Sequence, residues 1–541
     1  MGIVAILLLL AVVLAVVIVI QRSISSKEEA ATASGADIVA YLVLAIAMGV
    51  AGFALANLAS TAFPGETFIF DPAEEVATSL SALVVSVPFL VYFWRRQVRR
   101  RVTYPGSAGW TLYLSLAELV FLTAFVISTV SFLDSLIAGD VTSAWTGVIV
   151  FGAIVAFHEF AVKDTPPLSD AGELRRVLGS AIGLITTTVG LIGVLTGLFG
   201  LGLEAIGGDP RDLGFEPWLA MLVVGAPIWW YRWLRPWDSQ PGLPKLTWTV
   251  AVATVSLAVS LGAATSIVVM VSQYLVADTP PAGQHFDSLH VALSLFLAGI
   301  GVWFVHRREL RTAPADAYLV YAYAIAAIGL VTAISMAIAL TITTFSETLI
   351  VGRSGTDVVT FAVVLVAGAA TWLVLERRAT NKEVADTRVS WPRRLYTLGL
   401  GAVLGLIAAG ALITTIFVLL RRVLADSQSG SLLEPSTVLV YTGLASFYLL
   451  RFYAVERAAA PPADVVAPFH VTIICSHPGM IASRFPSQAK LRVLHHDDAA
   501  GAITEEMAAA IVEAVGNRPS YVWVDGDGFR IAPMRMSTNS L

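Results

Sequence analysis

The stretch Val91-Tyr92-Phe93-Trp94-Arg95-Arg96 ends an apolar segment with aromatic and then basic residues, and this type of ending recurs along the chain. Comparable endings lie at residues 157–163, 229–232, 303–308, 372–378 and 447–451. The steps between successive endings are 63, 73, 73, 69 and 75 residues, counted from Trp94, Phe157, Trp230, Trp303, Trp372 and Phe447. Such regular spacing predicts an array of one repeated supersecondary unit.

The composition indicates that the surrounding solvent is a lipid bilayer. Of the 541 residues, 57% are hydrophobic and only 13% are charged, whereas soluble domains are about half apolar and about a quarter charged. The net charge of −5 gives no reason to expect nucleic acid as a partner. The single cysteine, Cys475, excludes an intrachain disulfide and an all-cysteine metal site.

The apolar segments predict an all-α polytopic membrane protein with about thirteen transmembrane helices. A helix needs about 20 apolar residues to cross the hydrocarbon core. Candidate spans fall at 3–20, 37–61, 76–94, 110–137, 142–162, 177–203, 217–231, 246–276, 289–305, 315–344, 358–375, 395–420 and 436–454. After the first span, a longer helix is each time followed by a shorter one, which predicts six two-helix repeats.

The predicted domain organisation follows from these spans. Residues 1–36 form an N-terminal anchor helix and its linker, and residues 37–457 form the six hairpins. The predicted hairpins cover about 37–100, 101–165, 166–236, 237–308, 309–380 and 381–457. Residues 458–465, which include Pro461 and Pro462, form a linker to a C-terminal domain at 466–541.

Charge asymmetry predicts the topology. In the membrane region, 24 lysines and arginines lie on the linker side, which includes the segment after the first span, and four lie in the turns within hairpins. Because basic residues favour the cytoplasmic side, the linkers are predicted to be cytoplasmic, in a bacterial inner membrane. The first segment lacks a basic region before it and a cleavage pattern after it. It therefore predicts a retained anchor with its N-terminus outside, and thirteen spans then place the C-terminal domain in the cytoplasm.

The aromatic and basic residues that end the hairpins are predicted to be membrane anchors. Rings favour the headgroup region, and long basic side chains reach out to it. An aromatic ligand cage is the alternative interpretation. The predicted anchors are Trp94, Arg95, Arg96, Trp230, Arg232, Trp303, Arg307, Arg308, Trp372, Arg377 and Arg378.

These features resemble a known bacterial family. Tandem two-helix repeats that open with basic and aromatic residues, as at Arg393-Arg394-Leu395-Tyr396, and close with Trp and Arg are similar to a membrane-repeat domain of unknown function found in Chloroflexi-type genomes. The resemblance covers about residues 37–457. It implies the repeated membrane architecture and assigns no activity, cofactor or catalytic residue.

Few ionisable residues fall within the spans, and such residues are candidates for function. Glu118 lies two turns into the fourth span, and His158 and Glu159 lie at the cytoplasmic end of the fifth. We consider these three residues a candidate intramembrane polar site. The alternative is a local Glu–His hydrogen bond, or a Glu118 side chain that reaches toward the headgroups.

The C-terminal domain is predicted to be a small α+β sandwich in the order β-β-α-β-β. Its candidate chemistry is a metal site formed by Cys475, His477, His495 and Asp497, since these residue types ligate zinc. Their spacing matches no closed structural zinc site, and loop residues at strand ends are the alternative. We predict no cofactor.

Three functions stay open at this level. The favoured one is a non-enzymatic membrane sensor or scaffold, with the bilayer and a cytoplasmic protein as partners. The second is a transporter or channel with a path between hairpins, and the third is a membrane-tethered metal-dependent enzyme. The sequence determines neither the ligand nor the oligomeric state.

Overall fold

In the structure, which is a computed structural model, the chain forms two units, Met1–Tyr453 and Ala454–Leu541. The structure describes residues 35–61, 72–103, 108–139, 144–163, 170–205, 214–234, 242–276, 281–345, 355–383, 390–425, 431–459, 469–475, 489–495, 504–516, 520–525 and 528–533.

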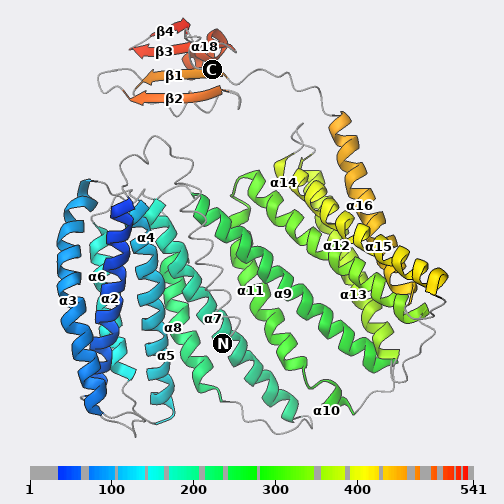
Figure 1. Cartoon of the computed structure of the whole chain (residues 1–541), viewed down its shortest axis with the longest axis horizontal. Coiled ribbons are helices and arrows are strands. Elements are labelled where there is room, and N and C mark those ends of the chain that lie inside the picture. The colour runs from blue at the N-terminus through cyan, green and yellow to red at the C-terminus, as the bar shows by residue number, and fades with distance from the viewer. Residues whose placement is uncertain are drawn as a thin grey trace. The chain divides into compact units, whose positions relative to one another are not determined.

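The first unit is built from helices (Figure 1). They are α2 (Gly35–Thr61), α3 (Pro72–Thr103), α4 (Ala108–Ala117), η1 (Glu118–Leu122), α5 (Thr123–Ile137), α6 (Ala144–Lys163), α7 (Asp170–Ala205), α8 (Glu216–Trp229), η2 (Trp230–Leu234), α9 (Leu243–Val276), α10 (Ala282–His285), α11 (Leu289–Leu310), α12 (Ala315–Phe345), α13 (Gly355–Glu383), α14 (Trp391–Arg394), η3 (Leu395–Leu400), α15 (Gly401–Ala425) and α16 (Leu433–Ala459). The η segments are π-helical turns.

Eleven helices of the described ranges are long and apolar enough to cross a membrane, and each coincides with a predicted span. The predicted span at 217–231 lies on α8 and η2. The predicted first span at 3–20 lies outside the described residues. The chain therefore has the architecture of a multi-pass helical membrane protein. The total of thirteen spans and the hairpin boundaries stay predictions.

Five successive pairs of helices pack together, and neighbouring pairs pack on each other. α2 packs on α3, α5 on α6, α7 on α8, α9 on α11, and α12 on α13. Neighbouring pairs meet through α2 and α6, α5 and α8, α7 and α11, and α9 and α12. Glycines permit close contact within pairs: a Cβ at Gly183 or Gly190 of α7 would collide with the backbone of α8. Close backbone packing is the usual source of helix association in a bilayer.

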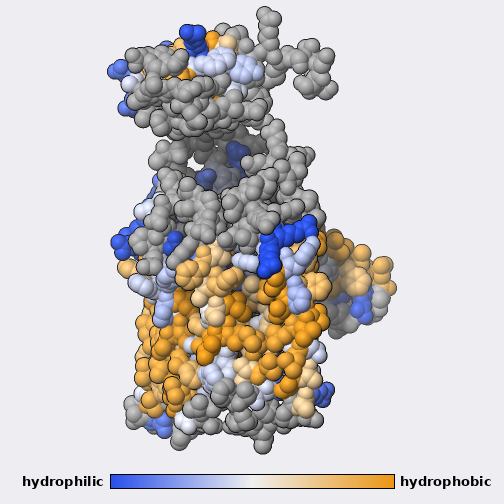
Figure 2. Space-filling model, turned by 90° about the vertical axis from the view of Figure 1, so that its left-hand side faces the viewer, coloured by the Kyte–Doolittle hydropathy of each residue, from blue (hydrophilic) through white to orange (hydrophobic). Residues whose placement is uncertain are grey.

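The outer surface of the helical unit carries an apolar band. Large hydrophobic side chains such as Val84, Phe160, Leu406 and Leu424 are more than 60% exposed. Figure 2 shows part of this band on the face that includes α3, where hydrophobic residues dominate. A surface of this kind is expected where lipid, and not water, covers the protein.

The second unit contains a four-stranded sheet and one described helix in the predicted order β-β-α-β-β. Its elements are β1 (Phe469–Cys475), β2 (Ala489–His495), α18 (Glu505–Val515), β3 (Ser520–Asp525) and β4 (Gly528–Pro533). The strand order is β2-β1-β3-β4, with β1 parallel to β2 and β3, and β3 antiparallel to β4.

Helix α18 packs its apolar stripe on one face of this sheet. Ala508, Ile511 and Val515 form a core with Val471, Ile473, Val522 and Val524. Residues Tyr521 and Trp523, which alternate with Val522 and Val524, are exposed, as the two-residue period of a strand requires. Thr504 caps the helix by accepting a hydrogen bond from the Met507 amide at 3.2 Å. Gly516, with a φ of 56°, follows its last turn.

Candidate functional site

Glu118 lies in a long helix at the point where the backbone widens. α4, η1 and α5 are continuous in sequence, and Glu118 is the first residue of the π-helical segment η1. A π-helical turn is rare, redirects the side chains around it and often marks a functional position. A second such turn, η2, carries Arg232 at the end of α8. Each of the two π-helical segments therefore carries an ionisable residue, Glu118 in η1 and Arg232 in η2.

The carboxylate of Glu118 binds two arginines of the neighbouring hairpin. Nε of Arg175, on α7, donates a hydrogen bond to Oε2 of Glu118 at 2.9 Å. Nη2 of Arg232, on η2, lies 2.6 Å from Oε1 of Glu118. Each oxygen of this carboxylate therefore has its own guanidinium partner.

Glu159 joins the same two arginines from α6. Nη2 of Arg175 donates to Oε1 of Glu159 at 2.6 Å, and Nη2 of Arg232 donates to the same oxygen. Two acids and two bases from four helical segments thus form a closed network. We call Glu118, Glu159, Arg175 and Arg232 the charge quartet.

The charge quartet is buried and electrically balanced. The side chains of Glu118, Arg175 and Arg232 are 2%, 4% and 7% exposed, and that of Glu159 is 32% exposed. A buried charge without a partner is costly, whereas mutual pairing of all four groups offsets the desolvation. Since both carboxylates are held by guanidinium groups, the arrangement suits a structural junction better than a proton-transfer site.

Gly179 provides the space in which the charge quartet fits. It lies one turn after Arg175 on α7, and a Cβ at this position would overlap Oε1 of Glu118 and approach Nε of Arg232. A glycine is therefore required here for a steric reason, because any side chain would displace the ion pairs.

His158 lies beside the charge quartet but bonds to a different partner. Its Nδ1 lies 2.8 Å from the Ile154 carbonyl oxygen, and its Nε2 lies 2.9 Å from the Tyr113 hydroxyl. Because a carbonyl can only accept, Nδ1 carries a hydrogen and donates to Ile154, while Nε2 pairs with the Tyr113 hydroxyl, which also lies 3.6 Å from Sδ of Met48. His158 also stacks on Phe121 of η1, at 5.5 Å between ring centres. The structure thus brings the three predicted polar residues into one region and pairs Glu118 and His158 with other groups.

Two of the residues predicted as anchors form hydrogen bonds between hairpins. Nε1 of Trp303 donates to the Tyr321 hydroxyl at 2.8 Å, and Nε1 of Trp372 donates to the Tyr396 hydroxyl at 3.0 Å. In both cases the tryptophan lies in the second half of its helix, α11 or α13, and the tyrosine lies near the start of the next hairpin. These tryptophans therefore also join successive hairpins.

The remaining predicted anchors occupy different environments. Trp230 is 56% exposed, Trp94 packs on Phe157 at 4.8 Å between ring centres, and the Arg307 guanidinium lies 4.7 Å from the Trp303 ring centre. Arg232 is buried in the charge quartet. The other predicted anchors are exposed, namely Arg95, Arg96, Arg308, Arg377 and Arg378.

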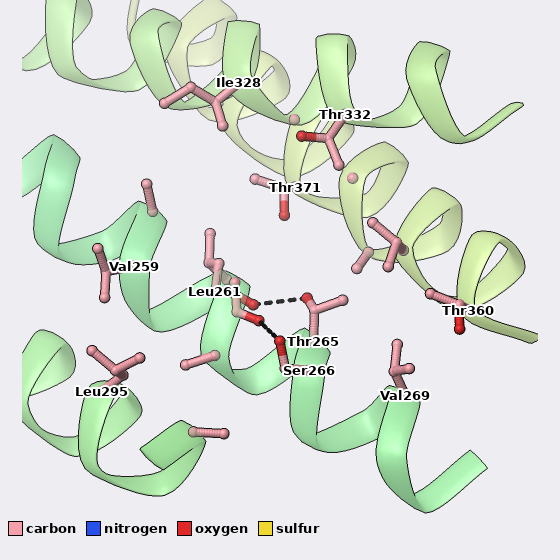
Figure 3. A pocket seen from close by; sticks show the side chains of 18 of the residues that line it. Val259, Leu261, Thr265, Ser266, Val269, Leu295, Ile328, Thr332, Thr360 and Thr371 are labelled. Atoms are coloured by element: carbon pink, nitrogen blue, oxygen red, sulfur yellow. Dashed lines mark hydrogen bonds between the residues drawn. The ribbon is translucent and has the colours of Figure 1, made fainter. Parts of the chain in front are cut away.

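Two grooves lie between helices of the first unit, and both are largely apolar. The larger, of about 700 Å³, is formed by α9, α11, α12 and α13 (Figure 3). The smaller, of about 580 Å³, is formed by α2, α3, α4 and η1. Threonine hydroxyls in the spans bond to the carbonyls of their own helices, as Thr186, Thr187 and Thr341 do. These hydroxyls do not require an ion.

The predicted metal site of the C-terminal domain is only partly within the described structure. Cys475 and His495 are register partners on the parallel strands β1 and β2, as the prediction of neighbouring strands requires. His477 and Asp497 lie outside the described residues. Within the described ranges, no group of three or more His, Cys, Asp or Glu is placed to hold a metal. The site stays a prediction.

Sequence reasoning missed Arg175 and gave Arg232 a different role. A signal was present, because a carboxylate inside a span requires a cationic partner. Arg175 and Arg232 lie near the same predicted membrane face, one at the start of a long span and one at the end of the next short span. Which basic residue meets Glu118 depends on how the hairpins pack.

Two segments of the chain, residues 37–159 and 319–445, match the model of the family described as "Domain of unknown function (DUF5671)". The predicted resemblance to a repeated domain of unknown function is therefore confirmed. No curated protein and no solved structure matches the chain.

Proposed function

We propose that this chain, which carries the DUF5671 domain twice, is a non-enzymatic sensor or scaffold of a bacterial inner membrane. In this proposal the C-terminal domain lies in the cytoplasm and binds a protein partner. The membrane unit holds that domain at the bilayer and transmits or fixes its position.

The observation that carries the proposal is the balance of the charge quartet. A transporter or channel requires polar groups that exchange partners along a path. Here the buried carboxylate of Glu118 is bound by Arg175 and Arg232, and the grooves are lined mostly by apolar side chains. The charges serve to join helices, which is the role expected in a scaffold.

The C-terminal domain supports the second half of the proposal. It forms a separate unit with its own hydrophobic core. Such a unit has the internal packing that a protein-binding domain requires. The exposed rings of Tyr521 and Trp523 lie 5.7 Å apart on the sheet, and aromatic residues are enriched where proteins bind each other.

Flux measurement tests the membrane half. The full chain reconstituted in vesicles is expected to leak protons and small ions no faster than vesicles without protein. A proton flux that depends on the chain and is abolished by Glu118→Gln would establish the transporter instead.

Labelling of single cysteines tests the topology. In a Cys475→Ser background, Glu505→Cys of α18 is expected to react with a membrane-impermeant maleimide only when the cytoplasmic side is accessible. Gln284→Cys, an exposed position in a turn, is the matched control and is expected to react from the opposite side. Reaction of Glu505→Cys from the outside would contradict the proposed orientation.

A further inference from the structure

The larger groove, between α9, α11, α12 and α13, carries an inference that is independent of the proposed function. We call it the α9–α13 groove. Its walls are formed by the fourth and fifth hairpins, and Figure 3 shows that its labelled side chains converge from α9, α11, α12 and α13. We propose that this groove is a binding site for the acyl chain of a membrane phospholipid.

The lining suits hydrocarbon. It includes Val259, Leu295, Ile325 and Ile328, together with alanines and glycines. Two hydroxyls in its centre donate inside their own helix: Thr265 to the Leu261 carbonyl at 2.7 Å, and Ser266 to the Gly262 carbonyl at 3.0 Å (Figure 3). An apolar chain therefore leaves these donors satisfied.

The size and the opening of the groove favour an acyl chain over a membrane-spanning helix as its occupant. Its volume of about 700 Å³ lies within the ~300–1,000 Å³ of small-ligand sites. A membrane-spanning helix of about 10 Å diameter and about 30 Å length needs roughly 2,400 Å³. Val259 and Ile328 in the lining are 40% and 45% exposed, so the groove opens to the outer surface of the unit, where lipid lies.

One end of the groove is polar, as a phospholipid requires. Thr360 and Ser288 line this end, and Nε2 of Gln273 donates to the Thr360 hydroxyl at 2.7 Å. Nε2 of His285 lies 2.8 Å from the Met270 carbonyl oxygen and donates to it. These groups lie at the turn end of their hairpins, so the ester and headgroup face the turn side while the chain extends toward Ile325.

Substitution of a glycine in the lining, Gly262, provides a way to fill the groove. A Cβ added at Gly262, which lines the groove, meets no atom within 4 Å. Because the Cβ has open space, a larger side chain at this position can extend into the groove. Gly301 of α11 has the same free space but does not line the groove, and it provides the matched control.

The test uses the full chain in phosphatidylcholine vesicles that contain phosphatidylcholine with a photoreactive diazirine on its acyl chain. After irradiation, mass spectrometry compares labelling in the groove with labelling of Leu406 and Ile413, which are 75% and 69% exposed on α15. We expect the groove to be labelled several-fold more than α15. Gly262→Leu is expected to reduce groove labelling to the α15 level, whereas Gly301→Leu leaves it unchanged.

Two results would overturn the proposal. One is equal groove labelling in the parent chain and Gly262→Leu. The other is groove labelling no greater than that of α15, including the case in which a second copy of the chain covers the groove and shields it from the lipid. If Gly262→Leu alters the size-exclusion profile, Val364→Phe fills the groove from α13 and is expected to give the same reduction.

Discussion

The two segments that match the family model, which we call the first and the second copy, position their third helix by different chemistry. In the copy at 37–159, Glu118 of η1 is held by ion pairs, and Tyr113 bonds to His158. In the copy at 319–445, the corresponding helix also contains a π-helical turn, η3, but Tyr396 accepts from Trp372. The residue five positions after Tyr113 is the charged Glu118, whereas the residue five positions after Tyr396 is Gly401, which has no side-chain charge.

The difference shows what the buried charges add. A π-helical turn forms in the corresponding helix of the second copy without such charges, so a turn of this kind does not depend on them. Arg175 and Arg232 lie in the hairpin between the two family matches. The charge quartet therefore joins the first copy to the hairpin that lies between the two matched segments, whereas the Trp372–Tyr396 bond lies within the second copy.

The largest effect is expected from Arg232→Met. This change leaves Glu118 and Glu159 with only Arg175, and loss of one partner from a buried ion pair costs about 3–5 kcal/mol. We expect a large decrease in the denaturation midpoint of the full chain in detergent. The double variant Glu118→Gln/Arg232→Met restores the balance of charge and is expected to lose less than the sum of the single variants. Strict additivity would show that the charge quartet is not coupled.

An intermediate effect is expected from Gly179→Ala. The added methyl group overlaps the Glu118 carboxylate, and overpacking of this kind costs about 1–3 kcal/mol. The measurement is the same denaturation midpoint. Gly202→Ala, on the same helix with open space around it, is the control and is expected to preserve or slightly raise stability. Equal effects of the two changes would mean that the space at Gly179 is not needed.

The smallest effect is expected in the second copy, from Trp372→Phe. The ring is kept while the hydrogen bond to Tyr396 is lost, at a cost of about 0.5–1.5 kcal/mol. Trp248→Phe, at a tryptophan whose Nε1 has no hydrogen-bond partner among the described residues, tests the same ring change without loss of a hydrogen bond. If Trp372→Phe destabilised the chain as much as Arg232→Met, the contrast between a charged and a neutral junction would be wrong.

The chain pattern predicted the helices well because bilayer thickness imposes a minimum length on each apolar segment. Each of the eleven membrane-length helices of the described ranges lies on a predicted span. The C-terminal element order was also predictable, since strand alternation, the Thr504 cap and Gly516 are local signals. The predicted residues Glu118, His158 and Glu159 were found because ionisable groups are rare in spans.

Partners were less predictable because they are non-local. Tyr396, which belongs to the basic and aromatic sequence that opens a repeat, is 5% exposed and bonds to Trp372. Arg232 resembled the other basic residues that end hairpins, yet it lies within the charge quartet. Sequence position shows how deep a side chain lies in the membrane but not which neighbouring hairpin it faces.

The sequence by itself determined membrane residence, helix positions, the family and the charge asymmetry from which topology is predicted, since each depends on composition along a short stretch. The tertiary structure decided that Glu118 and Glu159 share Arg175 and Arg232, that Gly179 makes room for them, and that a groove remains between α9, α11, α12 and α13. These features arise from how helices distant in the chain are rotated and packed against each other. In a bilayer, close packing and polar contacts between helices determine that arrangement, and the hydrophobicity that places each helix in the membrane does not.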